Sequence, residues 1–246
     1  MEVTLFAEKI FSVGFFPITN TLLTTLITTT VLCLFAIWAS KKTSLIPTSK
    51  IQLASEIVIE NIFSVIENLS DRKRAERFFP IVATFFIFII VANYLGLFPG
   101  FNTIGLNETH DGKLLFVPLF RSVNSDLNVT LALSLISVGM THYYSISSLG
   151  VVDYLKRYFS LNPVNLFVGL LEIVAEFTKI LSLSFRLFGN IFAGEALLVT
   201  ISSLFAFVLP LPFLFLEIIV GFVQAAIFMM LTLVFIVILT DKHTAH

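Results

Sequence analysis

The sequence predicts an all-α polytopic membrane protein, and three observations point to this fold class. Of the 246 residues, 57% are hydrophobic and 13% are charged, whereas a soluble domain typically has about 25% charged residues. The mean hydropathy is +0.97, and apolar stretches of membrane-spanning length recur along the chain. We expect one membrane domain over residues 1–246, with an N-terminal part (1–78), two further spans (79–149) and a C-terminal helical hairpin (160–240).

Five stretches are long and apolar enough to cross a hydrocarbon core of ~30 Å, which takes about 20 residues. They are residues 19–38, 79–98, 127–149, about 163–208 and about 213–239. The third is the weakest, because serine, threonine, tyrosine and His142 interrupt it. As a helix, residues 171–208 alone would extend about 57 Å, so we expect a long and strongly tilted hairpin. Pro210 and Pro212 separate its two helices.

Residues 50–70 predict an amphipathic helix rather than a span. Its apolar residues recur at helical spacing, with three glutamates between them. The apolar set is Ile51, Ala54, Val58, Ile62, Val65, Ile66 and Leu69, and the acidic set is Glu56, Glu60 and Glu67. Such a helix can lie at the membrane interface or against a partner, and plain packing against the chain's own spans is an equal alternative.

Lysine and arginine counts predict the orientation, because cytoplasmic loops carry an excess of both. The 40–79 connection holds seven of them, whereas the 99–126 connection holds only Lys113 and Arg121. We therefore expect the N-terminus and residues 99–126 outside. The 40–79 connection, a short 150–160 loop and the C-terminal tail are then cytoplasmic.

The composition also excludes several classes of function. Fifteen Lys and Arg against sixteen Asp and Glu give a net charge of -1, so no basic surface for nucleic acid is expected. Cys33 is the only cysteine, which excludes an internal disulfide or a cysteine metal cluster. No phosphate-binding loop of the GxxxxGK[ST] type occurs. We expect no catalytic site, cofactor or metal.

Several polar residues fall inside the last two spans, where ionisable groups are costly and mark functional sites. Those of the fourth span follow spacings of three and four residues or their sum, so they share one helix face. The set is Glu172, Glu176, Lys179, Arg186 and Asn190, with Glu195 beyond it and Glu217 and Gln224 on the last span.

The expected orientation places Arg186 between two polar groups. Glu172 and Glu176 lie about 15–21 Å along the helix on the cytoplasmic side, and Glu195 lies about 13 Å on the outer side. Arginine does not give up its proton, so Arg186 can hold a carboxylate ionised and bar a direct proton leak. Two half-pathways separated by a fixed cation suit a carrier-coupled translocator, so residues 160–240 are predicted to form an ion-translocating hairpin.

The same polar residues could instead have purely structural roles. Arg186 could pair with Glu176 or Glu172 simply to hold the helices together. Asn190 and Gln224 could hydrogen bond between helices without further function. Lys179 is interpreted as structural, and His142 as a satisfied polar residue of a weak span rather than a proton relay.

Residues 184–195 (SFRLFGNIFAGE) resemble the signature of subunit a of the rotary F-type ATP synthase. Three other segments agree in order and content: residues 92–99 (ANYLGLFP), 126–132 (DLNVTLA) and 224–228 (QAAIF). The resemblance extends from about residue 78 to residue 239, and the first 75 residues match mainly in layout.

The resemblance implies a proton-translocating stator with two offset half-channels against the rotating c-ring. Arg186 stands where the family has its indispensable arginine, facing the c-ring carboxylate. The outer half-channel is implied at Asn190, Glu195, Glu217 and Gln224, and the cytoplasmic one at Glu172, with Glu176 on the same stripe. Relatives often have a histidine at one of positions 195 and 217, whereas both are glutamates here.

The implied partners are the c-ring, the peripheral-stalk b subunits, membrane lipid and the translocated protons, with Na⁺ left open. The expected location is the bacterial inner membrane, with the mitochondrial inner membrane as the alternative. One rival interpretation is a secondary transporter with a buried Arg/Glu site, which would normally show inverted repeats. Another is a purely structural membrane subunit of a respiratory complex.

Overall fold

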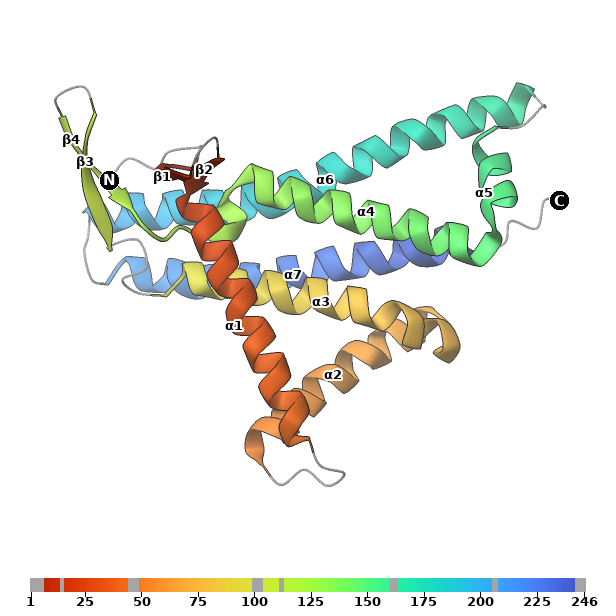
Figure 1. Cartoon of the computed structure of the whole chain (residues 1–246), viewed down its shortest axis with the longest axis horizontal. Helices are drawn as coiled ribbons and strands as arrows, with labels where there is room; N and C mark the ends of the chain where they lie inside the picture. The colour runs from red at the N-terminus through yellow and green to blue at the C-terminus, as the bar shows by residue number, and fades with distance from the viewer. Residues whose placement is uncertain are drawn as a thin grey trace.

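The computed structural model describes residues 7–13, 16–43, 49–98, 104–110, 113–159, 163–204 and 208–241. Its helices are α1 (Asn20–Lys42), α2 (Lys50–Leu69), α3 (Arg72–Gly96), α4 (Leu127–Leu149), α5 (Val151–Tyr158), α6 (Pro163–Leu204) and α7 (Pro210–Thr240). A 3-10 turn, η2 (Val123–Ser125), precedes α4. The predicted helical membrane fold is confirmed (Figure 1).

Two antiparallel hairpins are present that the sequence interpretation did not include. One pairs β1 (Lys9–Val13) with β2 (Phe16–Thr19), and the other pairs β3 (Gly105–His110) with β4 (Lys113–Pro118). Both lie outside the spans, next to the ends of helices, so they add to the helical architecture without altering it (Figure 1).

Four helices of the described residues are long and apolar enough to cross a membrane: α1, α3, α4 and α7. Helix α4 has the bounds predicted for the third span. Helix α6 is not among the four; its 42 residues correspond to about 63 Å. The predicted fourth span, on α6, therefore stays a prediction, and residues 205–207, at its expected end, lie outside the described residues.

Helices α3, α4 and α7 lie side by side, and α6 joins them along its C-terminal half (Figure 1). The N-terminal half of α6 diverges from α4, and α5 connects these two helices there. Leu183, Leu187 and Ile191 of α6 are buried against Phe85 and Ile89 of α3, together with residues of α7. Burial of apolar side chains in this seam fixes the register of the polar face of α6.

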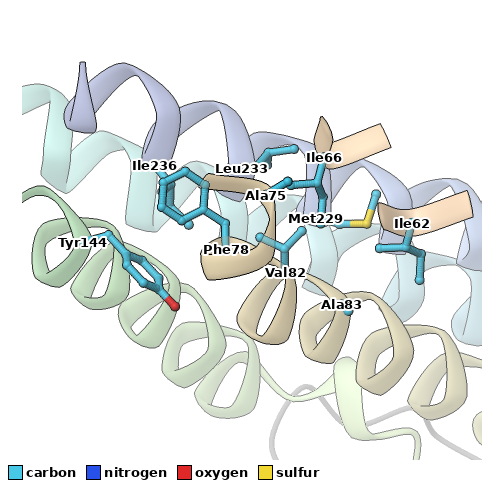
Figure 2. Close-up of a cluster of buried hydrophobic side chains, with 10 residues drawn as sticks. All are labelled: Ile62, Ile66, Ala75, Phe78, Val82, Ala83, Tyr144, Met229, Leu233 and Ile236. Carbon is cyan, nitrogen blue, oxygen red and sulfur yellow. The ribbon is translucent and has the colours of Figure 1, made fainter. Parts of the chain in front are cut away.

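Helix α2 returns from the far end of α1 to α3 (Figure 1). Ile62 and Ile66 are buried in the same cluster as Phe78 and Val82 of α3, which Figure 2 shows with side chains of α7. The alternative of packing against the chain's own helices is thus confirmed for the C-terminal part of α2. Ile51, farther toward its N-terminus, is 52% exposed.

Helix α5 corrects the expectation of a short loop over residues 150–160. Asp153 stands in its first turn, and Lys156 and Arg157 stand in its last turn, which complements the helix dipole at both ends. Tyr158 is buried. Eight residues are too few to give a clear helical period in the sequence, so this helix was not predicted.

The basic start of α3 and the ends of α4 and α7 lie together at one end of the bundle. Arg74 pairs with Asp241 at the end of α7, and Arg77 donates to Ser147 and Ser148 near the end of α4. Helix α5 lies at this same end, and both hairpins lie toward the other (Figure 1). The start of α3, the ends of α4 and α7, and α5, all predicted to be cytoplasmic, therefore share one end of the bundle (Figure 1).

Asn93 joins α3 to η2 and α7 inside the bundle. Its Nδ2 donates to the backbone oxygen of Gly221 at 2.9 Å, and its Oδ1 accepts from Asn124 Nδ2 at 2.7 Å. Asn93 is 2% exposed and Asn124 is fully buried. The close approach of α7 at Gly221 permits the first bond, since a Cβ there would meet Asn93 at 3.3 Å.

Asn93→Ala is expected to lower the free energy of unfolding by about 1–3 kcal/mol, because two buried polar partners lose their hydrogen bonds. Thermal unfolding of the purified subunit in detergent measures the change. Asn61→Ala, on the exposed surface of α2, is the matched control and should shift the midpoint little. Equal effects of the two substitutions would contradict a buried Asn93 network.

Candidate functional site

Arg186 lies on α6 beside the packed seam, and its side chain is exposed. Its Nη2 donates to Ser182 Oγ, one turn earlier, at 3.2 Å. It lines a cavity of about 440 Å³ together with Lys179, Ser182, and Leu231 and Phe235 of α7. Among the described residues no carboxylate lies within ion-pair distance of it, since the nearby glutamates pair elsewhere. The interpretation that Arg186 pairs with Glu176 or Glu172 is therefore wrong for this chain.

An uncovered apolar face of α6 borders Arg186. Phe177, Leu181 and Phe185 follow one another at spacings of four residues and are 67%, 50% and 53% exposed. Residues at this spacing share a helix face, and the face reaches Ser182 and Arg186 at its edge. The chain therefore presents its arginine next to a long, exposed apolar stripe.

A polar group lies on the C-terminal side of Arg186, between α6 and α7. Asn190 Nδ2 donates to Oε1 of buried Gln224 at 2.8 Å. Glu217 is 7% exposed, and its carboxylate fills the space where a Cβ on residue 194 would lie. Glu195 lies close enough for its charge to act on that of Glu217. These two glutamates thus lie near each other across the hairpin of α6 and α7.

Gly194 thus has a definite packing role. A methyl group at this position would overlap the Glu217 carboxylate, whereas one at Gly189 would meet no atom of the described chain within 4 Å. Close approach of α6 and α7 therefore depends on the glycine at position 194 and not on the one at position 189.

A second polar group lies on the N-terminal side of Arg186, where α4, α5 and α6 meet. Glu176 Oε1 accepts from Lys179 Nζ at 2.8 Å, and its Oε2 lies 3.6 Å from His142 Nε2. Glu172 instead turns to α5, where its Oε1 lies 2.5 Å from Arg157 Nη2. The two glutamates predicted on one stripe therefore have different partners.

A cavity of about 470 Å³ opens at this second group. It is lined by His142, Tyr154, Tyr158 and Glu176, with apolar side chains of the same three helices. Tyr154 Oη lies 3.0 Å from His142 Nδ1. Burial raises the pKa of the Tyr158 hydroxyl, so this side chain stays neutral at physiological pH.

Sequence reasoning identified the glutamates but missed the contacts of α5, where Arg157 pairs with Glu172 and Tyr154 contacts His142. Residues 150–160 were assigned to a loop, and His142 was interpreted as a satisfied polar residue of a weak span. The available signal was the polarity of α4 close to a short charged segment, which allows contact but does not predict it. Lys179 pairs with Glu176 and lies 4.7 Å from the centre of the Phe235 ring, which agrees with a structural role.

Asn190→Ala and Gln224→Ala should show a coupling free energy of about 0.6 kcal/mol in a double-mutant cycle, typical of hydrogen bonds between membrane helices. The coupling arises because the 2.8 Å bond is lost once in either single variant and cannot be lost again in the double variant. Thermal unfolding of the four proteins in detergent measures it. Strictly additive destabilisation would show that the two amides do not interact.

These features define a polytopic membrane protein whose last two helices carry polar groups on either side of an exposed arginine. The chain belongs to the ATP synthase A chain family, whose model matches residues 22–237. The resemblance inferred from the motif is confirmed, and with it the assignment to ATP synthesis and hydrogen-ion transport in a membrane.

Relatives from several bacteria match nearly the whole chain. ATP synthase subunit a of Legionella pneumophila strain Philadelphia 1 is 33% identical over 230 residues, which cover 94% of this chain and 90% of the relative. That of Oceanobacillus iheyensis is 35% identical over 232 residues, covering 89% and 90%. That of Moorella thermoacetica is 29% identical over 235 residues, covering 96% and 97%.

Proposed function

We propose that this chain is the proton-translocating stator subunit of an F-type ATP synthase in a bacterial cytoplasmic membrane. It works against a c-ring and is held by peripheral-stalk b subunits and membrane lipid. The observation that carries the proposal is Arg186, a fixed cation on an uncovered face with polar groups on both sides along α6. Membership of the family and its bacterial relatives support the location.

The two polar groups supply the two half-channels. Asn190, Glu195, Glu217 and Gln224 form the outer one, and Glu172 and Glu176 form the cytoplasmic one. A proton from the outer side neutralises a ring carboxylate, which can then face lipid because its charge is gone. After rotation the same carboxyl group meets the cytoplasmic half-channel and ionises.

Arg186 couples this proton exchange to rotation of the ring. Its charge attracts an ionised ring carboxylate and keeps the two half-channels from joining. Arginine keeps its proton at physiological pH, so protons must travel on the ring. Moving one charge through 100 mV supplies about 2.3 kcal/mol, so several protons must be summed for each ATP made by the catalytic sector.

Cysteine crosslinking tests whether the uncovered face of α6 meets the ring. In a Cys33→Ser background, Leu181→Cys or Phe185→Cys is expected to form a disulfide with a cysteine placed beside the ring carboxylate. Leu34→Cys, on an equally apolar and exposed part of α1, should not. Crosslinking from α1 but not from α6 would overturn the proposed rotor-facing surface.

A further inference from the structure

His142 is placed to exchange protons with Glu176. Its Nε2 lies 3.6 Å from Glu176 Oε2, and its Nδ1 lies 3.0 Å from Tyr154 Oη. One ring nitrogen therefore faces α6 and the other faces α5. Both ring nitrogens thus have a polar neighbour on another helix.

The two oxygens of Glu176 have different surroundings. Oε1 accepts the hydrogen bond from Lys179 at 2.8 Å. Oε2 is buried and makes no hydrogen bond within the described residues, and Glu176 as a whole is 8% exposed. Among the described residues, His142 is the ionisable group that Oε2 faces.

Glu172 and Arg157 do not compete for this oxygen. They pair with each other at 2.5 Å and are themselves largely buried, with side chains 20% and 14% exposed. Glu176 is thereby the acidic group of the cytoplasmic polar cluster that opens into the 470 Å³ cavity. Tyr154 and Tyr158 line it beside His142 and Glu176, and its volume leaves room for water next to these polar groups.

We propose that His142 is a proton-relay residue of the cytoplasmic half-channel, carrying protons between Glu176 and the surface at α5, with Tyr154 as its positioning residue. The inference rests on the proposed function, because it names a further residue on the route that leaves Arg186. Imidazole suits this task since it can bind a proton at one nitrogen and release another from its second nitrogen.

The proton passes from Glu176 through His142 in three steps. When Nδ1 carries the proton it donates to Tyr154 Oη, which leaves Nε2 free to accept. The O–H bond of protonated Glu176 breaks as an N–H bond forms at Nε2, directly or through one water. The imidazolium then releases the Nδ1 proton to a water molecule on the α5 side of the cavity. The ring returns to its first tautomer when Nε2 gives its proton to water and Nδ1 takes one from water. No net charge remains on the ring.

Charged and polar groups of the adjoining helices surround the His142 imidazole and influence its protonation. Glu176, Glu172 and Lys179 face it from α6, and Arg157 and Tyr154 face it from α5. The two carboxylates are each matched by one cation at 2.5–2.8 Å. A neutral imidazole with transient protonation is therefore compatible with this site.

The test uses the complete ATP synthase in liposomes, where proton flow through the membrane sector is driven by a potassium diffusion potential. His142→Ala is expected to lower proton flow by about a hundredfold, the usual contribution of a positioned acid–base group. Added imidazole should restore much of the flow through the enlarged cavity. Pyrazole, a ring of the same size that is not protonated near neutral pH, should not.

Three further variants separate a relay from packing. Tyr154→Phe should lower the flow less than His142→Ala and should not respond to imidazole. Leu135→Ala, which removes an apolar side chain from the same cavity, should keep the flow. His142→Gln, polar and similar in size, should behave as His142→Ala does and serves if the alanine variant fails to assemble.

Normal proton flow in His142→Gln or His142→Ala would overturn the relay. So would a loss in an assembled His142→Ala enzyme that imidazole does not restore. Loss of proton-driven ATP synthesis in Arg186→Gln, measured in the same liposomes, shows that the proposed function stands even if the relay fails. Normal ATP synthesis in Arg186→Gln would overturn the proposed function itself.

Discussion

Arg186→Gln is expected to lower proton-driven ATP synthesis by at least about a hundredfold. Opposite charges 4 Å apart attract by about 4 kcal/mol at an effective dielectric constant of 20, and the glutamine variant loses this attraction for the ring carboxylate. Because Arg186 makes no ion pair within the described chain, its removal strands no buried carboxylate. The subunit should therefore still assemble, and ATP synthesis in proteoliposomes isolates the electrostatic effect.

Arg72→Gln is the matched control for this change. Arg72 is also an arginine on a helix, with a side chain 74% exposed and weak contacts to Glu67 and Glu76 at 3.7 and 3.8 Å. Exposed pairs of this kind contribute little, so ATP synthesis should stay within about twofold of the unsubstituted enzyme. Equal activity of the two variants would remove Arg186 from the centre of the mechanism.

Gly194→Ala is expected to lower proton flow through the outer half-channel by about tenfold. The added methyl group overlaps the carboxylate of Glu217, which is 7% exposed. The carboxylate must therefore move away from Glu195 or strain the packing, and overpacking of this kind costs about 1–3 kcal/mol. Passive proton flow in liposomes measures the effect.

Gly139→Ala is the control that tests whether adding a methyl group to another helix also lowers proton flow. It adds an alanine side chain to α4, where nothing lies within 4 Å, so proton flow should be retained. Combining Gly194→Ala with Glu217→Asp should recover part of the flow, because the shorter side chain leaves room for the methyl group. A loss that Glu217→Asp does not relieve would assign Gly194 another role.

Four of the five spans, on α1, α3, α4 and α7, could be predicted from the sequence because length and hydropathy identify them. Helix α4 keeps its predicted bounds although it holds His142 and several hydroxyl residues, since the bundle satisfies those groups internally. Ser137 and Thr232, for example, share a hydrogen bond of 2.7 Å between α4 and α7. Helix α5 and the two hairpins were missed because each is too short for a hydrophobic period to emerge.

The candidate site, too, could be predicted from the sequence only in part. Glu176, Lys179 and Arg186 could be placed on one face of α6, because a continuous helix fixes the relation between residues three, four and seven apart. Contacts between different helices depend on how the helices pack, and residue spacing along the sequence does not predict this packing. His142 and Glu176, 34 residues apart in the chain, meet because α4 packs against α6.

We propose that two separate aqueous routes reach Arg186 from opposite sides of the membrane. In a Cys33→Ser background, Glu172→Cys and Glu195→Cys place a thiol in each route, and a membrane-impermeant thiol reagent is applied to one side of sealed vesicles at a time. If the two half-channels are separate, position 172 should be labelled from the cytoplasmic side alone and position 195 from the outer side alone. Labelling of either position from both sides would contradict it.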